Sequence, residues 1–165
     1  MVLEVTYKLR PFEPSDLEGV IQINRECLPE NYSPGFFMNL YKRFPATFIV
    51  AEINEKIVGY TMCRIETGIP SFKLLGIRKK GHVISLAVLP DHHRKGIGYA
   101  LLQKATKAME KYNAKECYLE VRESNISAIQ LYKKLGFEKA RTARNYYADG
   151  EDAFIMAIPL SNSTV

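Results

Sequence analysis

The most constraining stretch of this sequence runs from His82 to Met109, where a buried strand leads through a basic turn into a helix. Residues 83–89 are apolar except for Ser85, a pattern typical of a central strand that is covered on both faces. Pro90 cannot donate to a strand ladder, so the strand ends there. The apolar residues that then recur at helical spacing are Ile97, Leu101, Ala105, Ala108 and Tyr112.

The turn between this strand and the helix combines two glycines with basic side chains. Gly96 and Gly98 let the backbone approach a ligand closely, and the helix N-terminus that follows attracts anions through its unpaired N–H groups and dipole. Arg94 and Lys95 add positive charge. The dinucleotide fingerprint is incomplete because Leu101 replaces its third glycine, and no Walker motif is present. From the residues alone, the turn is either a cradle for a phosphate or pyrophosphate group or an ordinary tight turn.

Length and composition indicate one globular domain. A chain of 165 residues with 47% hydrophobic and 25% charged residues can bury a substantial core. No apolar run is long enough to span a membrane, and the N-terminal segment with Glu4 is unlike a secretory signal. Cys27, Cys63 and Cys117 are far apart, which favours neither a disulfide framework nor a zinc site. We therefore expect a cytoplasmic protein that binds no metal and no membrane.

The net charge of +5 is dispersed rather than aligned in a stripe. This distribution argues against sequence-specific binding of nucleic acid. The densest basic groups are residues 78–80 and the pair Arg94-Lys95 in the turn described above. A small polyanionic ligand explains the second group, and a solvated loop explains the first.

The remaining segments complete a single-domain α/β fold with a mixed sheet, in the order β-α-α-β-β-β-α-β-α-β-β. The expected strands are residues 5–10, 48–53, 56–65, 83–89, 117–121, 138–147 and 152–158. The expected helices begin at Ser15, at Ser33, at Ile97, and at Ser124 or Asn125. Residues 66–81 contain several glycines and are predicted to form a mobile loop. The domain is expected to span residues 1–160, followed by a frayed polar tail at residues 161–165.

Three separated motifs resemble the GNAT superfamily of acetyl-CoA-dependent N-acetyltransferases. They are SLAVLP, HHRKGIGYALL, and the pattern N-x-x-A-x-x-L-Y-x-x-L-G-F from Asn125 to Phe137. Three further segments are similar to the catalytic subunit of NatA-type N-terminal acetyltransferases, to its archaeal relatives and to RimI-like enzymes. These segments are LPENY at 28–32, GHVISLAV at 81–88 and YYADGEDAF at 146–154. The resemblance covers about residues 5–160.

The resemblance implies that acetyl-CoA is the co-substrate and that no metal is needed. In the family, the turn follows Gln/Arg-x-x-Gly-x-Gly/Ala, and His93 stands in the first position here. The main chain of Leu86 and Val88 would hold the pantetheine arm and thioester, with the Val88 N–H as an oxyanion donor. The residues implied in cofactor binding are Leu86, Ala87, Val88, His93, Arg94, Lys95, Gly96, Ile97, Gly98, Tyr99, Asn125 and Tyr132.

The same resemblance implies a proton path from the substrate amine through Glu30 and His82, and proton donation by Tyr132 to the departing thiolate. Taken alone, His82 at the start of a buried strand is typical of a core histidine, and Tyr132 is typical of helix packing. The resemblance is what assigns them chemical roles. Glu120 occupies a place where relatives often have histidine, and it is either a third member of the proton path or an acid on the sheet face.

The implied function is transfer of acetyl from acetyl-CoA to the free α-amine of protein N-termini, by direct attack on the thioester. Tyr32, Tyr146 and Tyr147 are expected to wall the slot for the peptide; adjacent tyrosines on a strand point to opposite faces. The alternatives are an enzyme of the same fold that acts on lysine side chains or on a ribosomal-protein terminus, and a non-catalytic acyl-CoA- or ribosome-binding module. Proximity to the ribosome and an auxiliary subunit are options rather than requirements.

Overall fold

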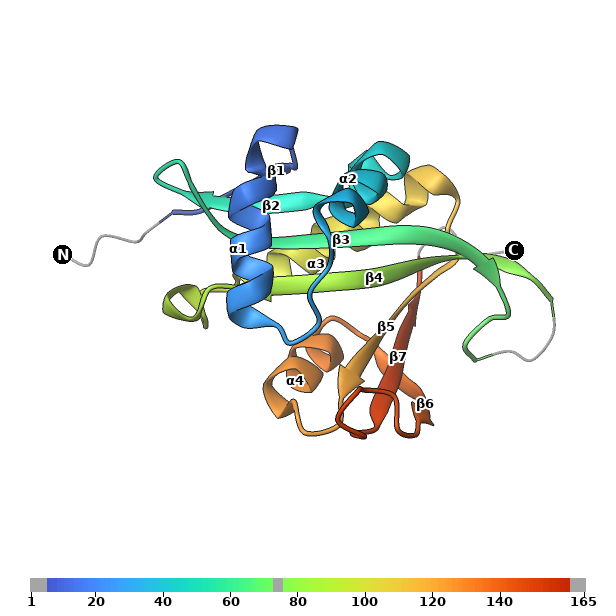
Figure 1. Ribbon diagram of the computed structural model, residues 1–165. Coiled ribbons are helices and arrows are strands. Elements are labelled where there is room, and N and C mark those ends of the chain that lie inside the picture. The colour runs from blue at the N-terminus through green and yellow to red at the C-terminus, as the bar shows by residue number, and fades with distance from the viewer. Residues whose placement is uncertain (1–5, 73–75, 161–165) are drawn as a thin grey trace. The chain divides into compact units, whose positions relative to one another are not determined.

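The computed structural model describes residues 6–72 and 76–160, and its elements follow the predicted order. The strands are β1 (Lys8–Pro11), β2 (Ile49–Ile53), β3 (Lys56–Gly68), β4 (Arg78–Val88), β5 (Glu116–Arg122), β6 (Glu138–Ala143) and β7 (Ala153–Pro159). The helices are α1 (Leu17–Cys27), α2 (Pro34–Arg43), α3 (Ile97–Ala108) and α4 (Ile126–Lys134). The hydrogen-bonded strand order is β1-β2-β3-β4-β5-β7-β6, labelled in Figure 1. The predicted mixed α/β fold is confirmed; the predicted tail at residues 161–165 lies outside the described residues.

The chain forms two compact units. The first comprises Met1–Arg64 with Ile84–Ala108, and the second comprises Ile65–Val83 with Met109–Val165. Strands β3 and β4 each contribute residues to both units. In the first unit, β2 pairs with β1 and β3 in antiparallel fashion. In the second, β4 and β5 are parallel, and β7 lies antiparallel between β5 and β6.

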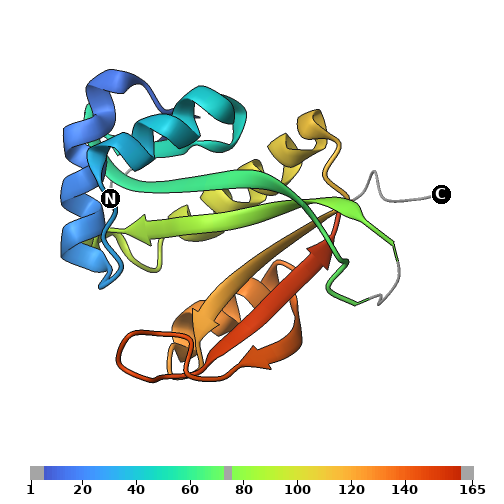
Figure 2. The same ribbon diagram turned by 45° about the vertical axis from the view of Figure 1, so that its right-hand side comes forward.

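The helices of the first unit cover both faces of its strands, with α1 and α2 on one face and α3 on the other (Figures 1 and 2). Helix α2 begins as predicted, because the Ser33 Oγ accepts a hydrogen bond from the Phe36 N–H at 3.2 Å. The predicted start of α1 at Ser15 is wrong. The helix begins at Leu17, after a 3-10 turn at Pro14–Asp16 with Glu13 as its N-cap. Asp16 completes the capping box of this turn, since its carboxylate accepts hydrogen bonds from the Glu13 N–H at 2.8 Å and from the Arg10 guanidinium at 2.7 and 2.8 Å.

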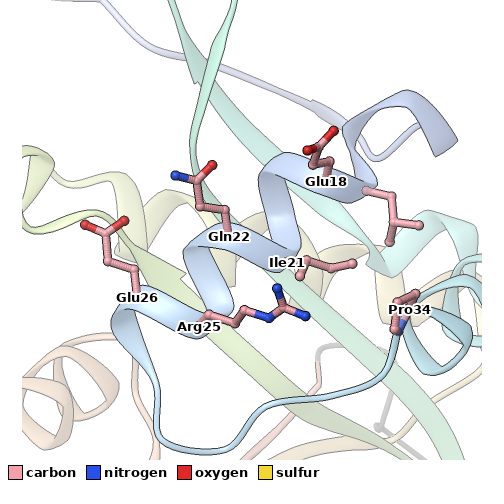
Figure 3. Close-up of a pocket in the computed structure, with 7 residues that line it drawn as sticks. Glu18, Ile21, Gln22, Arg25, Glu26 and Pro34 are labelled. Carbon is pink, nitrogen blue, oxygen red and sulfur yellow. The ribbon is translucent and has the colours of Figure 1, made fainter.

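A pocket lies alongside α1, and none of the residues predicted for the functional site lines it (Figure 3). Its lining residues are Leu17, Glu18, Ile21, Gln22, Arg25, Glu26 and Pro34. Ile21 and Arg25 extend from the side of α1 that is nearer Pro34, at the start of α2. This pocket is therefore formed by residues of α1 and the start of α2 and not by the basic turn.

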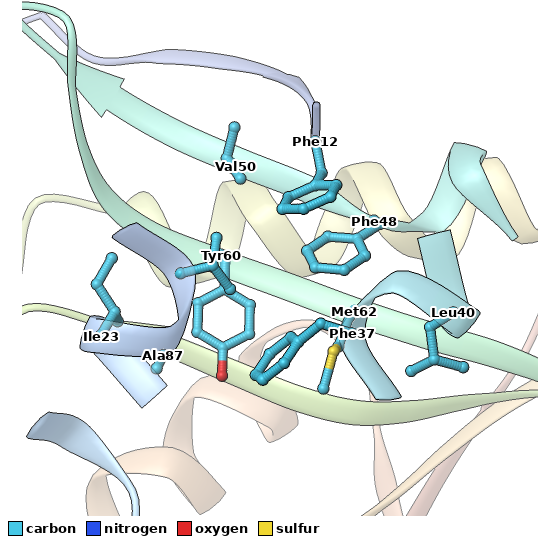
Figure 4. Packing of buried hydrophobic residues seen from close by; sticks show 10 residues of the cluster. Phe12, Ile23, Phe37, Leu40, Phe48, Val50, Tyr60, Met62 and Ala87 are labelled. Atoms are coloured by element: carbon cyan, nitrogen blue, oxygen red, sulfur yellow. The ribbon is translucent and has the colours of Figure 1, made fainter. Parts of the chain in front are cut away.

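The buried core cluster of the first unit contains four aromatic rings, those of Phe12, Phe37, Phe48 and Tyr60 (Figure 4). Phe12 stacks on Phe48 with 4.0 Å between ring centroids, and Phe37 meets the Tyr60 ring at 66°. The Tyr60 hydroxyl is 2.6 Å from the Ser85 Oγ, which ties β3 to β4. Burial raises the pKa of Tyr60 to about 12, so its phenol stays protonated and acts only as a structural hydrogen-bonding group.

In the second unit, Gly81 and His82 of β4 lie opposite Cys117 and Tyr118 of β5. Gly81 is required because a Cβ there would come within 2.1 Å of the Met109 Sδ. Helix α4 lies against β5 and β7 in both views (Figures 1 and 2).

The structure corrects two boundaries. The predicted loop at residues 66–81 is shorter, because β3 continues through Gly68 and β4 begins at Arg78. Lys80 can lie within a strand because its ammonium pairs with Glu116 at 3.4 Å. The predicted strand at 138–147 ends at Ala143, since Asn145 adopts a positive φ of 53° and its N–H bonds to the Asp152 carboxylate.

Candidate active site

The basic turn is fixed at the end of β4 by side chains that bind one carbonyl. His93 Nε2 lies 2.6 Å from the Val88 oxygen, and the Cys27 Sγ lies 3.8 Å from the same oxygen. The N–H of Leu89 donates to the Val58 oxygen at 2.8 Å, which holds the next residue against β3. His93 therefore shapes the turn through the backbone, in the position where the family pattern has Gln or Arg.

The turn itself presents backbone and positive charge to solvent. Arg94 and Gly96 both have positive φ values, of 60° and 78°, and a Cβ on Gly96 would meet nothing within 4 Å. The helix ladder of α3 starts here, with the Ala100 N–H bonded to the Gly96 oxygen at 3.0 Å. Arg94 and Lys95 are exposed, whereas Ile97 is buried and anchors the helix. An exposed, positively charged turn at the N-terminus of a twelve-residue helix suits a phosphate group.

The loop that carries Glu30 and Tyr32 is clamped by a single buried amide. The Asn24 side chain is 1% exposed; its Nδ2 donates to the Glu30 carbonyl at 3.1 Å, and its Oδ1 accepts from the Tyr32 N–H at 3.3 Å. The Tyr32 ring stacks on Phe36 at 4.8 Å, and its hydroxyl donates to the Ile84 carbonyl at 3.4 Å. Asn24 was not predicted for the site. A polar residue on the apolar stripe of a helix was the sequence feature that could have indicated its role.

His82 lies between two carboxylates of the second unit. Its Nδ1 is 2.9 Å from the Glu66 Oε1, and its Nε2 is 2.7 Å from the Glu120 Oε2. The Tyr118 ring stacks on the imidazole with 4.2 Å between centroids, and the Tyr118 hydroxyl donates to the other oxygen of Glu66. Glu120 therefore lies within reach of the histidine, which favours the proton-path interpretation over that of an isolated surface acid.

Glu66 and Tyr118 were not predicted for the site. Glu66 fell within the segment predicted to be a loop, and only its place near the end of β3 brings it to His82. Tyr118 and Glu120 are two residues apart on β5 and therefore share one face of that strand. This spacing was visible in the sequence, but nothing there indicated that β4 would pair beside β5 in the observed register.

Helix α4 positions two further predicted residues. Asn125 caps the helix, as predicted, because its Oδ1 accepts from the Ala128 N–H at 3.2 Å. Tyr132 lies on the same helix, with its ring centroid 6.0 Å from that of Phe137. Burial raises the pKa of Tyr132 to about 12, so its phenol remains a hydrogen-bond donor at every physiological pH.

Tyr146 and Tyr147 lie in the loop between β6 and β7 rather than on a strand. The expected arrangement on opposite strand faces is therefore wrong, because the strand ends before them and their rings meet edge to face at 5.0 Å. The Arg122 guanidinium lies over the Tyr147 ring at 4.0 Å and donates to the Asp149 carboxylate at 2.8 Å. The Arg122 guanidinium thus contacts this loop at two places, the Tyr147 ring and the Asp149 carboxylate.

The structure places the predicted residues in two groups. The first unit holds Glu30, Tyr32, Leu86, Ala87, Val88, His93, Arg94, Lys95, Gly96, Ile97, Gly98 and Tyr99, and the second holds His82, Asn125, Tyr132, Tyr146 and Tyr147. Within residues 6–72 and 76–160, no group of His, Cys, Asp and Glu side chains is arranged to hold a metal ion. In the same part of the chain, no helix has the length and apolarity needed to cross a membrane.

Comparison with known proteins identifies the family. The family model for the acetyltransferase (GNAT) family matches residues 17–137. The chain belongs to the GNAT family of acetyltransferases. It is 54% identical over 156 residues to a protein of Sulfurisphaera tokodaii named N-alpha-acetyltransferase, with 93% of each chain covered.

Two solved structures show the same GNAT fold. Ard1 from Thermoplasma volcanium has a TM-score of 0.78 at 29% identity, covering 94% of this chain and 99% of Ard1. The ribosomal-protein-S18-alanine N-acetyltransferase from Escherichia coli has a TM-score of 0.76 at 31% identity, covering 94% and 95%. The predicted GNAT membership and enzyme class are thereby confirmed.

Proposed function

We propose that this GNAT enzyme is an N-terminal acetyltransferase, which transfers acetyl from acetyl-CoA to the free α-amine of protein N-termini. The observation that carries the proposal is the clamped loop of Glu30 and Tyr32, whose Tyr32 hydroxyl reaches the main chain of β4 at Ile84. The name of the relative from Sulfurisphaera tokodaii supports the same substrate class.

The residues of the first unit fit acetyl-CoA. The open backbone at Gly96, the exposed charges of Arg94 and Lys95 and the N-terminus of α3 suit its pyrophosphate. Leu86–Val88, at the end of β4, would hold the pantetheine arm, with the Val88 N–H directed to the thioester oxygen. Bound acetyl-CoA supplies an acetyl group that is activated as a thioester. The full set proposed for the cofactor is Leu86, Ala87, Val88, His93, Arg94, Lys95, Gly96, Ile97, Gly98, Tyr99, Asn125 and Tyr132.

We propose that Glu30 and His82, with Glu120, accept the proton that the substrate amine loses. The His82 Nε2 lies 2.7 Å from the Glu120 Oε2, which supports a joint role of these two side chains. The Asn24 amide holds the backbone of the Glu30 loop, which supports a defined place for that carboxylate. Tyr132 would hydrogen-bond the departing thiolate and donate its proton.

The chemistry of the amine agrees with this set of weak bases. An α-amino group has a pKa of about 7.7–8.0, so roughly a tenth of it is neutral at pH 7. A lysine amine with a pKa of about 10.4 is neutral only about 4 times in 10,000. Carboxylates and a histidine are therefore matched to an α-amine, and lysine would need a stronger base. Tyr32, Tyr146 and Tyr147 would wall the peptide slot.

We also propose that residues 1–160 act as one acetyltransferase domain in the cytoplasm. Cys63 and Cys117 are buried, which is typical of cysteines that serve as small apolar core residues. Lys80 counts against a basic RNA-binding patch, because its ammonium is held by the Ile69 carbonyl at 2.8 Å and by Glu116. Proximity to the ribosome and an auxiliary subunit remain options of this proposal.

The deciding experiment measures CoA release with two peptides that begin with Ser and contain an internal lysine, one of them with a blocked N-terminus. We expect release only with the free N-terminus. Equal release from both peptides would indicate lysine acetylation, and acetyl-CoA binding without release would favour a non-catalytic module. Among variants, we expect Glu30→Gln, His82→Ala and Tyr132→Phe each to lower kcat/KM by about 100-fold. Wild-type rates in all three would refute the assigned roles.

A further inference from the structure

We propose that Glu66 and Tyr118 are positioning residues, which set the orientation and the proton content of His82. This inference rests on the proposed role of His82 in the proton path. Glu66 contacts His82 through the Nδ1 that faces away from Glu120, so it would act on the reaction only through the imidazole.

Contacts link the side chains of Glu66, Tyr118, His82 and Glu120 to one another. Glu66 uses one carboxylate oxygen for the His82 Nδ1 and the other for the Tyr118 hydroxyl, while the Tyr118 ring lies nearly parallel to the imidazole at 14°. The ring plane of His82 is therefore held at its edge by Glu66 and on its face by Tyr118. The His82 side chain is 9% exposed, compared with 25% for Glu66 and 16% for Glu120.

The geometry gives each ring nitrogen a carboxylate partner. Each ring nitrogen faces a carboxylate oxygen, and each of these two contacts needs one proton to be a hydrogen bond. Removal of either carboxylate takes away one of the two partners, so the hydrogen bonding of the imidazole depends on Glu66 as well as on Glu120.

Lys80 and Glu116 lie beside these side chains. Lys80 lies over the Tyr118 ring at 4.3 Å, but its ammonium pairs with Glu116, which also accepts the Ser71 N–H at 2.9 Å. This cation is thus directed toward a different carboxylate. Tyr118 links the two sets, because its hydroxyl donates to Glu66 while its ring receives Lys80.

Glu66→Gln should shift the pH dependence in a defined direction. A carboxylate beside the ring favours the protonated imidazole, so its removal lets the ring lose its proton at lower pH. We expect the acidic limb of the kcat/KM profile to move to lower pH. We also expect the maximum rate to fall about tenfold, as for other residues that orient a histidine. Tyr118→Phe keeps the stacked ring and loses only the hydroxyl, so its effect should have the same direction and be smaller.

The test is a double-mutant cycle between Glu66 and His82, with Glu138→Gln as the matched control. Glu138 is an exposed carboxylate on β6 of the same unit. We expect Glu66→Gln to lower kcat/KM in the wild type and to have no further effect in His82→Ala, because it acts through the imidazole. An equal loss in both backgrounds, or a pH profile that matches the control, would overturn the inference.

A second measurement does not depend on turnover. The histidine side-chain nitrogen shifts, followed by NMR as a function of pH, report the titration midpoint of His82 directly. We expect the midpoint to move to lower pH in Glu66→Gln and to stay in place in Glu138→Gln. An unchanged midpoint in Glu66→Gln would refute the inference even if acetylation proceeds. A shifted midpoint without N-terminal acetylation would support the positioning pair and refute the proposed function instead.

Discussion

Glu30 and His82 are held by opposite means. The loop of Glu30 is held through its backbone, by an uncharged amide that binds one carbonyl and one N–H. His82 is held through its side chain, by two carboxylates and a stacked phenol. The first arrangement fixes a position whatever the charge of Glu30, whereas the second makes position and protonation depend on each other. In the proposed proton path, Glu30 would therefore be the group whose backbone position does not change with pH.

The largest effect is expected from Asn24→Ala, which breaks the backbone clamp. The Glu30 carbonyl and the Tyr32 N–H would both lose their hydrogen bond to the Asn24 amide, and losing the partner of a buried polar group costs about 1–3 kcal/mol. We expect a lower melting temperature and a loss of peptide kcat/KM of at least about tenfold, measured below the transition of the variant. Asn39→Ala, an exposed position on α2, is the control. Acetyl-CoA affinity that falls in parallel with peptide kcat/KM would contradict a local clamp.

An intermediate effect is expected from Arg122→Ala, which affects the loop of Tyr146 and Tyr147. Arg122 holds the tyrosine loop through the Asp149 carboxylate and the Tyr147 ring. The Glu151 N–H and Arg122 lower the pKa of Asp149, so the pair stays charged across the working pH range. We expect the KM for the peptide to rise several-fold with kcat preserved, because the slot loosens while the proton path is intact.

The effect of added salt tests whether the Arg122–Asp149 ion pair orders the tyrosine loop. Added salt should raise the peptide KM of the wild type toward that of Arg122→Ala, since it screens the exposed ion pair. Arg141→Ala, an exposed position on β6, should behave as the wild type does. A fall in kcat with unchanged KM would place Arg122 in the chemistry rather than in the slot.

The smallest effect is expected from Tyr32→Phe. The lost hydrogen bond to the Ile84 carbonyl is long, at 3.4 Å, and the ring keeps its stacking on Phe36. We expect peptide kcat/KM to fall by less than about fivefold, because a weak neutral hydrogen bond contributes about 1 kcal/mol or less. A much larger loss would show that the hydroxyl contacts the substrate, and the backbone clamp would then be only part of the loop's role.

Short sequence patterns predicted the parts of this fold that are determined by residues close together in the sequence. The element order, the cap of α2 at Ser33 and the cap of α4 at Asn125 could all be derived from short patterns. The start of α1 could not, because a 3-10 turn with Glu13 as its N-cap precedes the helix, and Asp16 in this turn pairs with Arg10. A residue whose hydrogen-bond partner lies only a few positions away in the sequence can therefore be predicted from a short sequence pattern.

The candidate site divides in the same way. The basic turn was visible in the sequence, since two glycines, two basic residues and a helix start follow one another there. The contact of Glu66 with His82 was not visible, because it depends on how far β3 continues into the segment predicted to be a loop. The ends of strands are where sequence patterns are weakest, and the Glu66 side chain that contacts His82 comes from such an end.

The Asn24 clamp has a consequence for how this loop can change during evolution. One amide reaches the backbone of Glu30 and of Tyr32, and so spans Asn31 without using its side chain. An insertion or deletion between α1 and Tyr32 would move one of the two bonded groups out of reach. Lineages that keep the clamp are therefore expected to keep the length of this loop constant.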